Sequence, residues 1–89
     1  MTINNTWFVY FVRCNDNSLY AGITTDIERR LHQHNHNKLG AKYTRAKRPV
    51  TLVFIEKAIN KSVASKREHQ LKKLTKDQKE QLVNTYSSK

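Results

Sequence analysis

Residues 7–23 read WFVYFVRCNDNSLYAGI, two apolar runs separated by a short polar segment. The first run, residues 7–12, is aromatic or β-branched at every position, which predicts a central strand covered on both faces. The polar residues 15–17 are turn formers, and residues 18–23 return as a second strand. The sequence therefore predicts a β-hairpin over this stretch.

The length of the hairpin turn sets the register of the two strands. A three-residue loop would pair Val12 with Tyr20 and Tyr10 with Gly22. Both tyrosines would then lie on one face of the hairpin. A two-residue turn would put the two phenols on opposite faces.

A helix is predicted directly after the hairpin, because Thr25 and Glu28 stand at capping-box spacing. This helix should run to about residue 35. Its apolar stripe consists of residues at helical spacing: Ile27, Leu31 and His34. Arg30 lies at the border of that stripe, where a long side chain can extend from the core edge into a cleft.

The remaining elements follow a long segment without sustained periodicity, residues 36–49. Because a loop of this length is more often functional than slack, we expect it to contact the substrate. Residues 50–55 are predicted as a third strand and residues 60–74 as a helix. A second capping box opens a short last helix over residues 75–83, and residues 86–89 are expected to fray.

The predicted fold class is α/β (α+β). We expect a sandwich with a small, mainly antiparallel three-stranded sheet flanked by helices, in the order β-β-α-β-α-α. A chain of 89 residues is short enough for a single domain over residues 1–89, with an ordered core at about residues 7–84.

The chain is strongly basic, with 17 Lys and Arg against 7 Asp and Glu, a formal net charge of +10 at pH 7. Residues 1–37 are electrically balanced, so the whole excess lies in residues 38–89. With 37% hydrophobic residues, this composition is typical of a globular domain that binds a polyanion. The alternative is a lysine-rich surface that only keeps the protein soluble.

A single cysteine, Cys14, excludes an intramolecular disulfide and a paired-cysteine metal site, which favours a reducing, cytoplasmic location. The N-terminal residues lack the basic segment of a signal peptide. The apolar run after them ends at Arg13, which is too short to span a bilayer. No membrane association is expected.

Five residues stand in an order that points to a known family: Tyr10, Tyr20, Gly22, Arg30 and Glu68. Over roughly residues 7–83, the chain resembles the GIY-YIG nuclease superfamily, in particular its small stand-alone bacterial members. Residues 8–10 take the place of the first motif, and residues 20–22, with Gly22 as a structural residue, that of the second. Phe8 stands where the first motif has glycine, and Ala21 stands where the second has isoleucine.

The resemblance implies a role for each polar residue. Tyr10 and Tyr20 line the catalytic face, and Arg30 contacts the scissile phosphate. Glu68 holds one divalent cation, Mg²⁺ or Mn²⁺, which is weakly bound without substrate. Tyr43 also enters the site, and the choice among the three tyrosines as activator of the attacking water stays open. Phosphodiester hydrolysis suits this set, because a guanidinium and a cation stabilise charge that develops on the phosphate oxygens.

Structural interpretations of the same residues remain open. Arg30 could pair with Asp26, and Glu68 could pair with Lys72, each four residues away on its own helix. His32, His34 and His36 suggest a zinc site. Only His32 and His36 share a helix face, however, and no Cys or Asp completes a set of zinc ligands.

Further basic residues are predicted to contact the nucleic-acid backbone: Arg29, His32, Lys42, Arg45, Lys47, Arg48, Lys72 and Lys73. The sequence therefore predicts a metal-dependent DNA endonuclease, directed by DNA structure rather than base sequence, with a role in DNA repair or recombination. DNA is favoured over RNA, a protein partner could supply specificity, and a monomer or homodimer is expected. The alternative is a catalytically inactive DNA- or RNA-binding module of the same fold. A weaker alternative is a basic adaptor for an acidic protein.

Overall fold

The computed structural model describes residues 6–36 and 42–87. Within these residues the chain forms, in order, β1 (Trp7–Arg13), β2 (Leu19–Thr24), α1 (Ile27–His36), α2 (Lys42–Arg45), β3 (Thr51–Ala58), α3 (Lys61–Lys72) and α4 (Lys76–Ser87). The predicted order of elements is confirmed, and α2 is an additional short helix inside the segment predicted as a loop. Residues 37–41 of that segment lie outside the described residues.

The hairpin of β1 and β2 has the register of a three-residue loop. Val12 pairs with Tyr20 and Tyr10 pairs with Gly22. The last loop residue, Asn17, has φ of 71°, the left-handed conformation that such loops require and that asparagine tolerates. Both tyrosines therefore lie on one face of the hairpin.

The sheet has the strand order β2-β1-β3, and both strand pairs are antiparallel. β1 is thus the central strand, as its apolar run predicts. The pairing of β1 with β3 shifts between Phe11 and Val12, which face Phe54 and Leu52 in turn. Val53 is left as the extra residue of a β-bulge, which bends β3 at this point.

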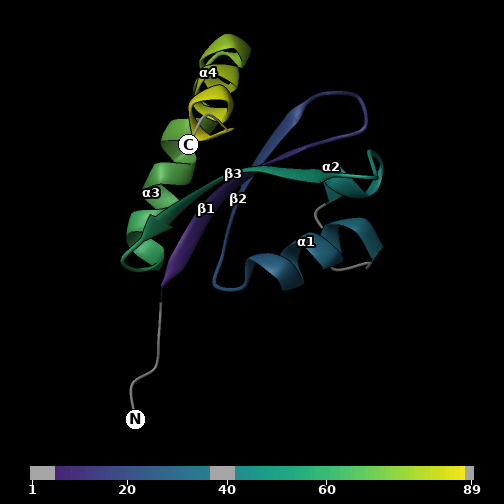
Figure 1. The fold of residues 1–89 in the computed structure, drawn as a ribbon. Helices are drawn as coiled ribbons and strands as arrows, with labels where there is room; N and C mark the ends of the chain where they lie inside the picture. The colour runs from purple at the N-terminus through teal and green to yellow at the C-terminus, as the bar shows by residue number, and fades with distance from the viewer. Residues whose placement is uncertain (1–5, 37–41, 88–89) are drawn as a thin grey trace.

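Helices cover both sides of the sheet, with α1 and α2 on one side and α3 and α4 on the other (Figure 1). Alternate residues of β1 divide between two apolar clusters. Val9 and Phe11 belong to the cluster that includes buried residues of α3 and α4. Tyr10 and Val12 belong to the cluster against which α1 packs. The predicted antiparallel sheet flanked by helices is confirmed. No helix in the two described ranges has the length and apolar character needed to cross a bilayer.

The start of α1 differs from the sequence prediction. Asp26 rather than Thr25 caps the helix, because its Oδ1 accepts a hydrogen bond from the Arg29 N–H at 3.1 Å. The Thr24 hydroxyl oxygen accepts from the Asp26 N–H at 3.0 Å and holds the cap in place. The helix therefore begins one residue later than a cap at Thr25 would allow.

The end of α4 also differs. The helix continues to Ser87 instead of ending near residue 83. Tyr86 packs its ring against Phe54 of β3, with 5.7 Å between the ring centroids. This contact with the core orders the last turn, so the expected fraying is wrong for Tyr86. Residues 88–89 lie outside the described residues.

Candidate functional site

Tyr10 lies at the centre of the candidate site, on the face of β1 that α1 covers. The residue is 2% exposed, and Gly22 lies directly across the strand pair. A Cβ atom at position 22 would lie 2.6 Å from Tyr10 Cζ, closer than real Cβ contacts come. The missing side chain of Gly22 therefore provides the space that the phenol occupies.

A buried hydrogen-bonded chain runs from Tyr10 through His34 to Thr44. The Tyr10 hydroxyl lies 2.7 Å from His34 Nε2, and His34 Nδ1 lies 2.8 Å from the Thr44 hydroxyl. Burial, followed by the charges of Arg30 and Arg48, lowers the pKa of His34 to about 4, so the imidazole is neutral at pH 7. Burial raises the pKa of Tyr10 to about 12, although Arg30 opposes this shift. Both groups are therefore uncharged hydrogen-bonding partners.

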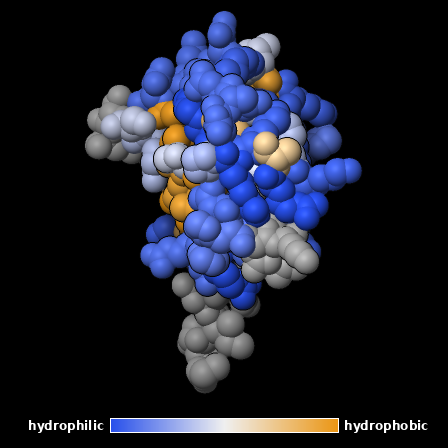
Figure 2. Space-filling view, turned by 90° about the vertical axis from the view of Figure 1, so that its right-hand side faces the viewer, coloured by the Kyte–Doolittle hydropathy of each residue, from blue (hydrophilic) through white to orange (hydrophobic). Residues whose placement is uncertain are grey.

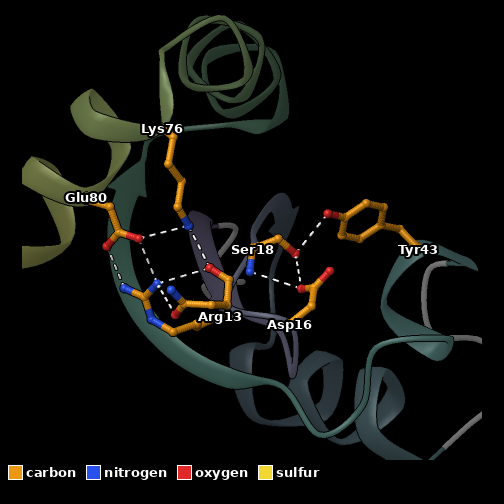
Figure 3. Close-up of polar contacts among 7 residues, drawn as sticks. Arg13, Asp16, Ser18, Tyr43, Lys76 and Glu80 are labelled. Atoms are coloured by element: carbon orange, nitrogen blue, oxygen red, sulfur yellow. Dashed lines mark hydrogen bonds and ion pairs between the residues drawn. The ribbon is translucent and has the colours of Figure 1, made fainter.

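Two further tyrosines extend the site toward the surface. The ring of Tyr20 meets His34 edge to face at 5.7 Å and stacks on Tyr43 at 5.6 Å. Tyr43 is 42% exposed, and its hydroxyl donates to Ser18 Oγ at 2.9 Å (Figure 3). Lys47 Nζ lies 3.9 Å from the centroid of the Tyr43 ring. The hydrogen bond with Lys47, followed by the one with Ser18, lowers the pKa of Tyr43.

Arg30 and Glu68 approach the same phenol from different helices. Arg30 forms a hydrogen bond that lowers the pKa of Tyr10, and the charge of Glu68 raises it. The Arg30 guanidinium also donates to Gln33 at 2.9 Å. The Glu68 carboxylate pairs with Lys72 at 3.4 Å. This is the ion pair within one helix that the sequence offered as an alternative role for Glu68. The structure thus groups the two phenols, the guanidinium and the carboxylate.

Glu68 is the carboxylate of this group that a cation could use. Its side chain is 22% exposed, and a single carboxylate with open access suits Mg²⁺ or Mn²⁺, which take their other ligands from water and phosphate. Across residues 6–36 and 42–87, no three or more His, Cys, Asp or Glu side chains group as metal ligands. The rings of His32 and His36 lie 4.8 Å apart on α1, without a third such ligand in those ranges.

The predicted nucleic-acid contacts fall into two groups. Most of them are exposed side chains: Arg29, His32, Lys42, Arg45, Lys72 and Lys73. Of these, Lys72 also pairs with Glu68, and the two remaining residues are partly buried and engaged within the protein. Lys47 pairs with Asp16 at 2.9 Å, and the Arg48 guanidinium donates to the backbone carbonyls of Gln33 and His34 near the end of α1. Figure 2 shows the side of the molecule that carries α1 and α2, and this surface is predominantly hydrophilic.

From the sequence, His34 is expected in the apolar stripe of the helix, and Thr44 is not among the predicted site residues. His34 is the polar member of an otherwise apolar stripe and lies one helical turn after Arg30. That combination could have marked it as a partner of the site. Thr44 carries no such signal, because its contact depends on the placement of α2 against α1.

A comparison with protein families matches the profile of the GIY-YIG catalytic domain to residues 6–81. The chain belongs to the GIY-YIG family. It is 52% identical over 77 residues to the UPF0213 protein DP2720 of Desulfotalea psychrophila. The matched segment covers 86% of this chain and 70% of that protein. It is 49% identical over 81 residues to the UPF0213 protein HQ_3675A of Haloquadratum walsbyi, covering 91% and 90%.

Two solved structures of similar proteins share this GIY-YIG fold. The solution NMR structure of the UPF0213 protein BH0048 from Bacillus halodurans has a TM-score of 0.57 and 40% identity, and covers 90% of this chain and 84% of that chain. The solution NMR structure of protein EF2693 from E. faecalis has a TM-score of 0.63 and 42% identity, with coverages of 100% and 94%.

Ala21, at the isoleucine position of the second GIY-YIG motif, faces away from the site. It is 4% exposed and belongs to the cluster of Val9 and Phe11, on the other side of the sheet from Tyr10. This departure from the motif therefore alters the core behind the strand and leaves the polar groups around Tyr10 in place.

Proposed function

We propose that this chain is a metal-dependent endonuclease that hydrolyses phosphodiester bonds in DNA. Support comes from the grouping of three polar residues, Tyr20, Arg30 and Glu68, around the buried phenol of Tyr10. The GIY-YIG profile and the net charge of +10 favour a nucleic-acid substrate for this group. We assign selectivity to DNA geometry rather than to base sequence, because the phosphate contacts proposed below carry no sequence information.

Arg30 binds the scissile phosphate in this proposal. Its guanidinium is partly buried at the border of α1, hydrogen-bonded to Tyr10 and Gln33, so it is held in position before the substrate arrives. A fixed guanidinium stabilises the negative charge that develops on the non-bridging oxygens, and little reorganisation is needed at the moment of reaction.

Glu68 holds the divalent cation in this proposal. A bound Mg²⁺ or Mn²⁺ supplies Lewis-acid stabilisation of charge on the phosphate oxygens. Because one carboxylate cannot complete an octahedral shell, affinity without substrate is weak. Lys72, which pairs with Glu68 at 3.4 Å, balances the carboxylate in the free protein.

Tyr20 is the phenol that we assign to the attacking water. Tyr10 is 2% exposed, uses its hydroxyl on His34 and has a pKa raised to about 12, so it is poorly suited to contact water or to ionise. Tyr20 is only partly buried, next to Tyr43, and Lys72 Nζ lies 5.9 Å from its ring centroid. Tyr43 is the second candidate, because its pKa is lowered and it is exposed.

Cleavage of DNA by the purified protein tests this proposal. Supercoiled, branched and single-stranded DNA would be incubated with Mg²⁺ or Mn²⁺, beside matched RNA. We expect metal-dependent cleavage of DNA. Arg30→Ala and Glu68→Gln should each lower the rate about a hundredfold or more, because each removes charge stabilisation in the transition state. Lys57→Ala and Glu28→Gln, which remove exposed charges elsewhere, serve as matched controls.

The phenols are tested in the same assay with Tyr20→Phe and Tyr43→Phe. A loss confined to Tyr20→Phe supports its assignment to the attacking water, and a loss confined to Tyr43→Phe moves that role to Tyr43. Tight, salt-sensitive binding without cleavage would identify the inactive binding module instead. If the protein neither binds nor cleaves DNA, the remaining alternative is an adaptor for an acidic protein.

A further inference from the structure

An open cavity of about 410 Å³ lies beside the candidate site, between the hairpin loop and the start of α4. Its floor is residues 16–19, one wall is Tyr43, and the opposite wall is Lys76 and Lys79. Figure 3 shows Lys76 and Tyr43 approaching the loop from opposite sides. Because the Tyr43 ring also stacks on Tyr20, the cavity adjoins the phenols of the site directly.

The acidic groups around this cavity are already matched by partners. Asp16 accepts hydrogen bonds from the Ser18 N–H and hydroxyl and pairs with Lys47 at 2.9 Å. Glu80 pairs with Arg13 at 2.6 Å and with Lys76 at 2.9 Å. These contacts offset both carboxylates, so the cavity does not repel an anion through an unpaired negative charge.

Lys79 supplies a positive charge that these contacts leave unused. It lines the cavity and is partly buried, one helical turn after Lys76. Among residues 6–36 and 42–87, its ammonium has no side-chain hydrogen bond or ion pair. Lys76 is different, because its Nζ donates to the Asn17 carbonyl at 2.6 Å as well as pairing with Glu80. A partly buried ammonium on an open wall is stabilised by an incoming anion.

We propose that this cavity binds a second phosphate group of the DNA strand, outside the scissile position, with Lys79 as its principal contact. The inference rests on the proposed nuclease function and names the path of the substrate. The strand passes from the site at Arg30, Tyr20 and Glu68, over Tyr43, to the start of α4. One phosphate is then held at Arg30 and a second at Lys79, and these two contacts fix the register of the strand across the reacting bond.

Binding of a forked DNA duplex without divalent metal, followed by fluorescence anisotropy, tests the cavity independently of cleavage. We expect Lys79→Gln to weaken binding about fivefold or more and to lower the slope of log affinity against log salt by about one. Lys79→Arg should keep most of the affinity. Lys57→Gln removes an exposed lysine near the other end of β1 and should have a smaller effect. Equal effects of Lys79→Gln and Lys57→Gln would overturn the proposal.

A second measurement alters the DNA, so its first step uses the unaltered protein and only its comparison step needs the Lys79→Gln variant. Neutral methylphosphonate linkages are placed one at a time along the strand. We expect one position away from the cleavage point to weaken binding, and Lys79→Gln to be insensitive to that same position, because the two changes remove one interaction. No such position, or additive effects, would contradict the cavity assignment.

The outcomes separate the two proposals. Lys79-dependent binding without cleavage would refute the nuclease and keep the phosphate cavity. If the protein cleaves DNA but Lys79→Gln leaves DNA binding unchanged, only the proposal of the phosphate cavity would be refuted. Inorganic phosphate is titrated by itself as a further arm. If it binds at Lys79 while DNA binding is indifferent to this residue, the cavity belongs to a free anion and the proposal fails.

Discussion

Gly22 leaves the space that the Tyr10 phenol occupies, so a side chain at position 22 would collide with the buried ring. Substitution Gly22→Ala would put a methyl group against the Tyr10 hydroxyl and 2.6 Å from Cζ. We expect a loss of about 1–3 kcal/mol in the free energy of unfolding, because the buried ring cannot move aside freely. Urea unfolding measures the change. Ser62→Ala, at an exposed position of α3, is the control and should shift stability by less than about 0.5 kcal/mol.

His34 makes stability depend on pH at the residue scale. Its pKa is about 4 in the folded protein against 6.5 for the free group, so the unfolded chain binds the proton first as the pH falls. The free energy of unfolding should therefore be highest above pH 6.5 and fall between pH 6.5 and about 4, by on the order of 3 kcal/mol in total.

Urea unfolding at a series of pH values measures this dependence. His34→Gln should remove the slope between the two pKa values and lower stability at neutral pH. His32→Gln, which alters an exposed histidine on the same helix, should keep the slope. A slope that survives in His34→Gln would show that another group is responsible.

At the scale of the element, α4 begins on a reciprocal cap. The Thr75 N–H donates to Gln78 Oε1 at 2.9 Å, and the Gln78 N–H donates to Thr75 Oγ1 at 3.2 Å. This capping box was predicted from the spacing of the two residues. It places Lys76 and Lys79 at the wall of the proposed phosphate cavity.

The same helix offers a matched pair of substitutions. Thr75→Ala removes the cap and should lower the free energy of unfolding by about 1 kcal/mol. Thr85→Ala removes only an exposed hydroxyl that donates to the Gln81 carbonyl at 2.9 Å, so it should change stability by less than about 0.5 kcal/mol. Thermal unfolding of both variants measures the difference, and equal shifts would mean that the cap contributes little.

At the scale of the whole molecule, a charge of +10 on 89 residues makes binding to nucleic acid depend on salt. If four or five phosphates are neutralised, a fourfold rise in salt should weaken DNA binding by about 150- to 500-fold, because bound counterions are released on association. Anisotropy titrations over a range of salt concentrations measure the slope. A slope close to zero would rule out backbone contacts as the main source of affinity.

Much of the fold could be read from local pattern. The apolar run of β1, the turn residues after it and the capping residues act over a few neighbouring positions, so their consequences follow from spacing. The start of α1 was missed by one residue through a local competition between Thr25 and Asp26 for the cap, and the larger differences arise where a distant contact overrides local preference. Tyr86 extends α4 because it packs on Phe54 of β3, and the contact of Thr44 with His34 joins α2 to α1.

The candidate site divides along the same line. The residue types and their order follow from the chain. The sequence allowed a loop of three or of two residues, and the structure has the three-residue loop that pairs Tyr10 with Gly22. The link of Tyr10 through His34 to Thr44, and the cavity between the hairpin loop and α4, join segments far apart in the sequence. Their formation depends on how helices pack across a sheet, and local spacing does not encode that packing.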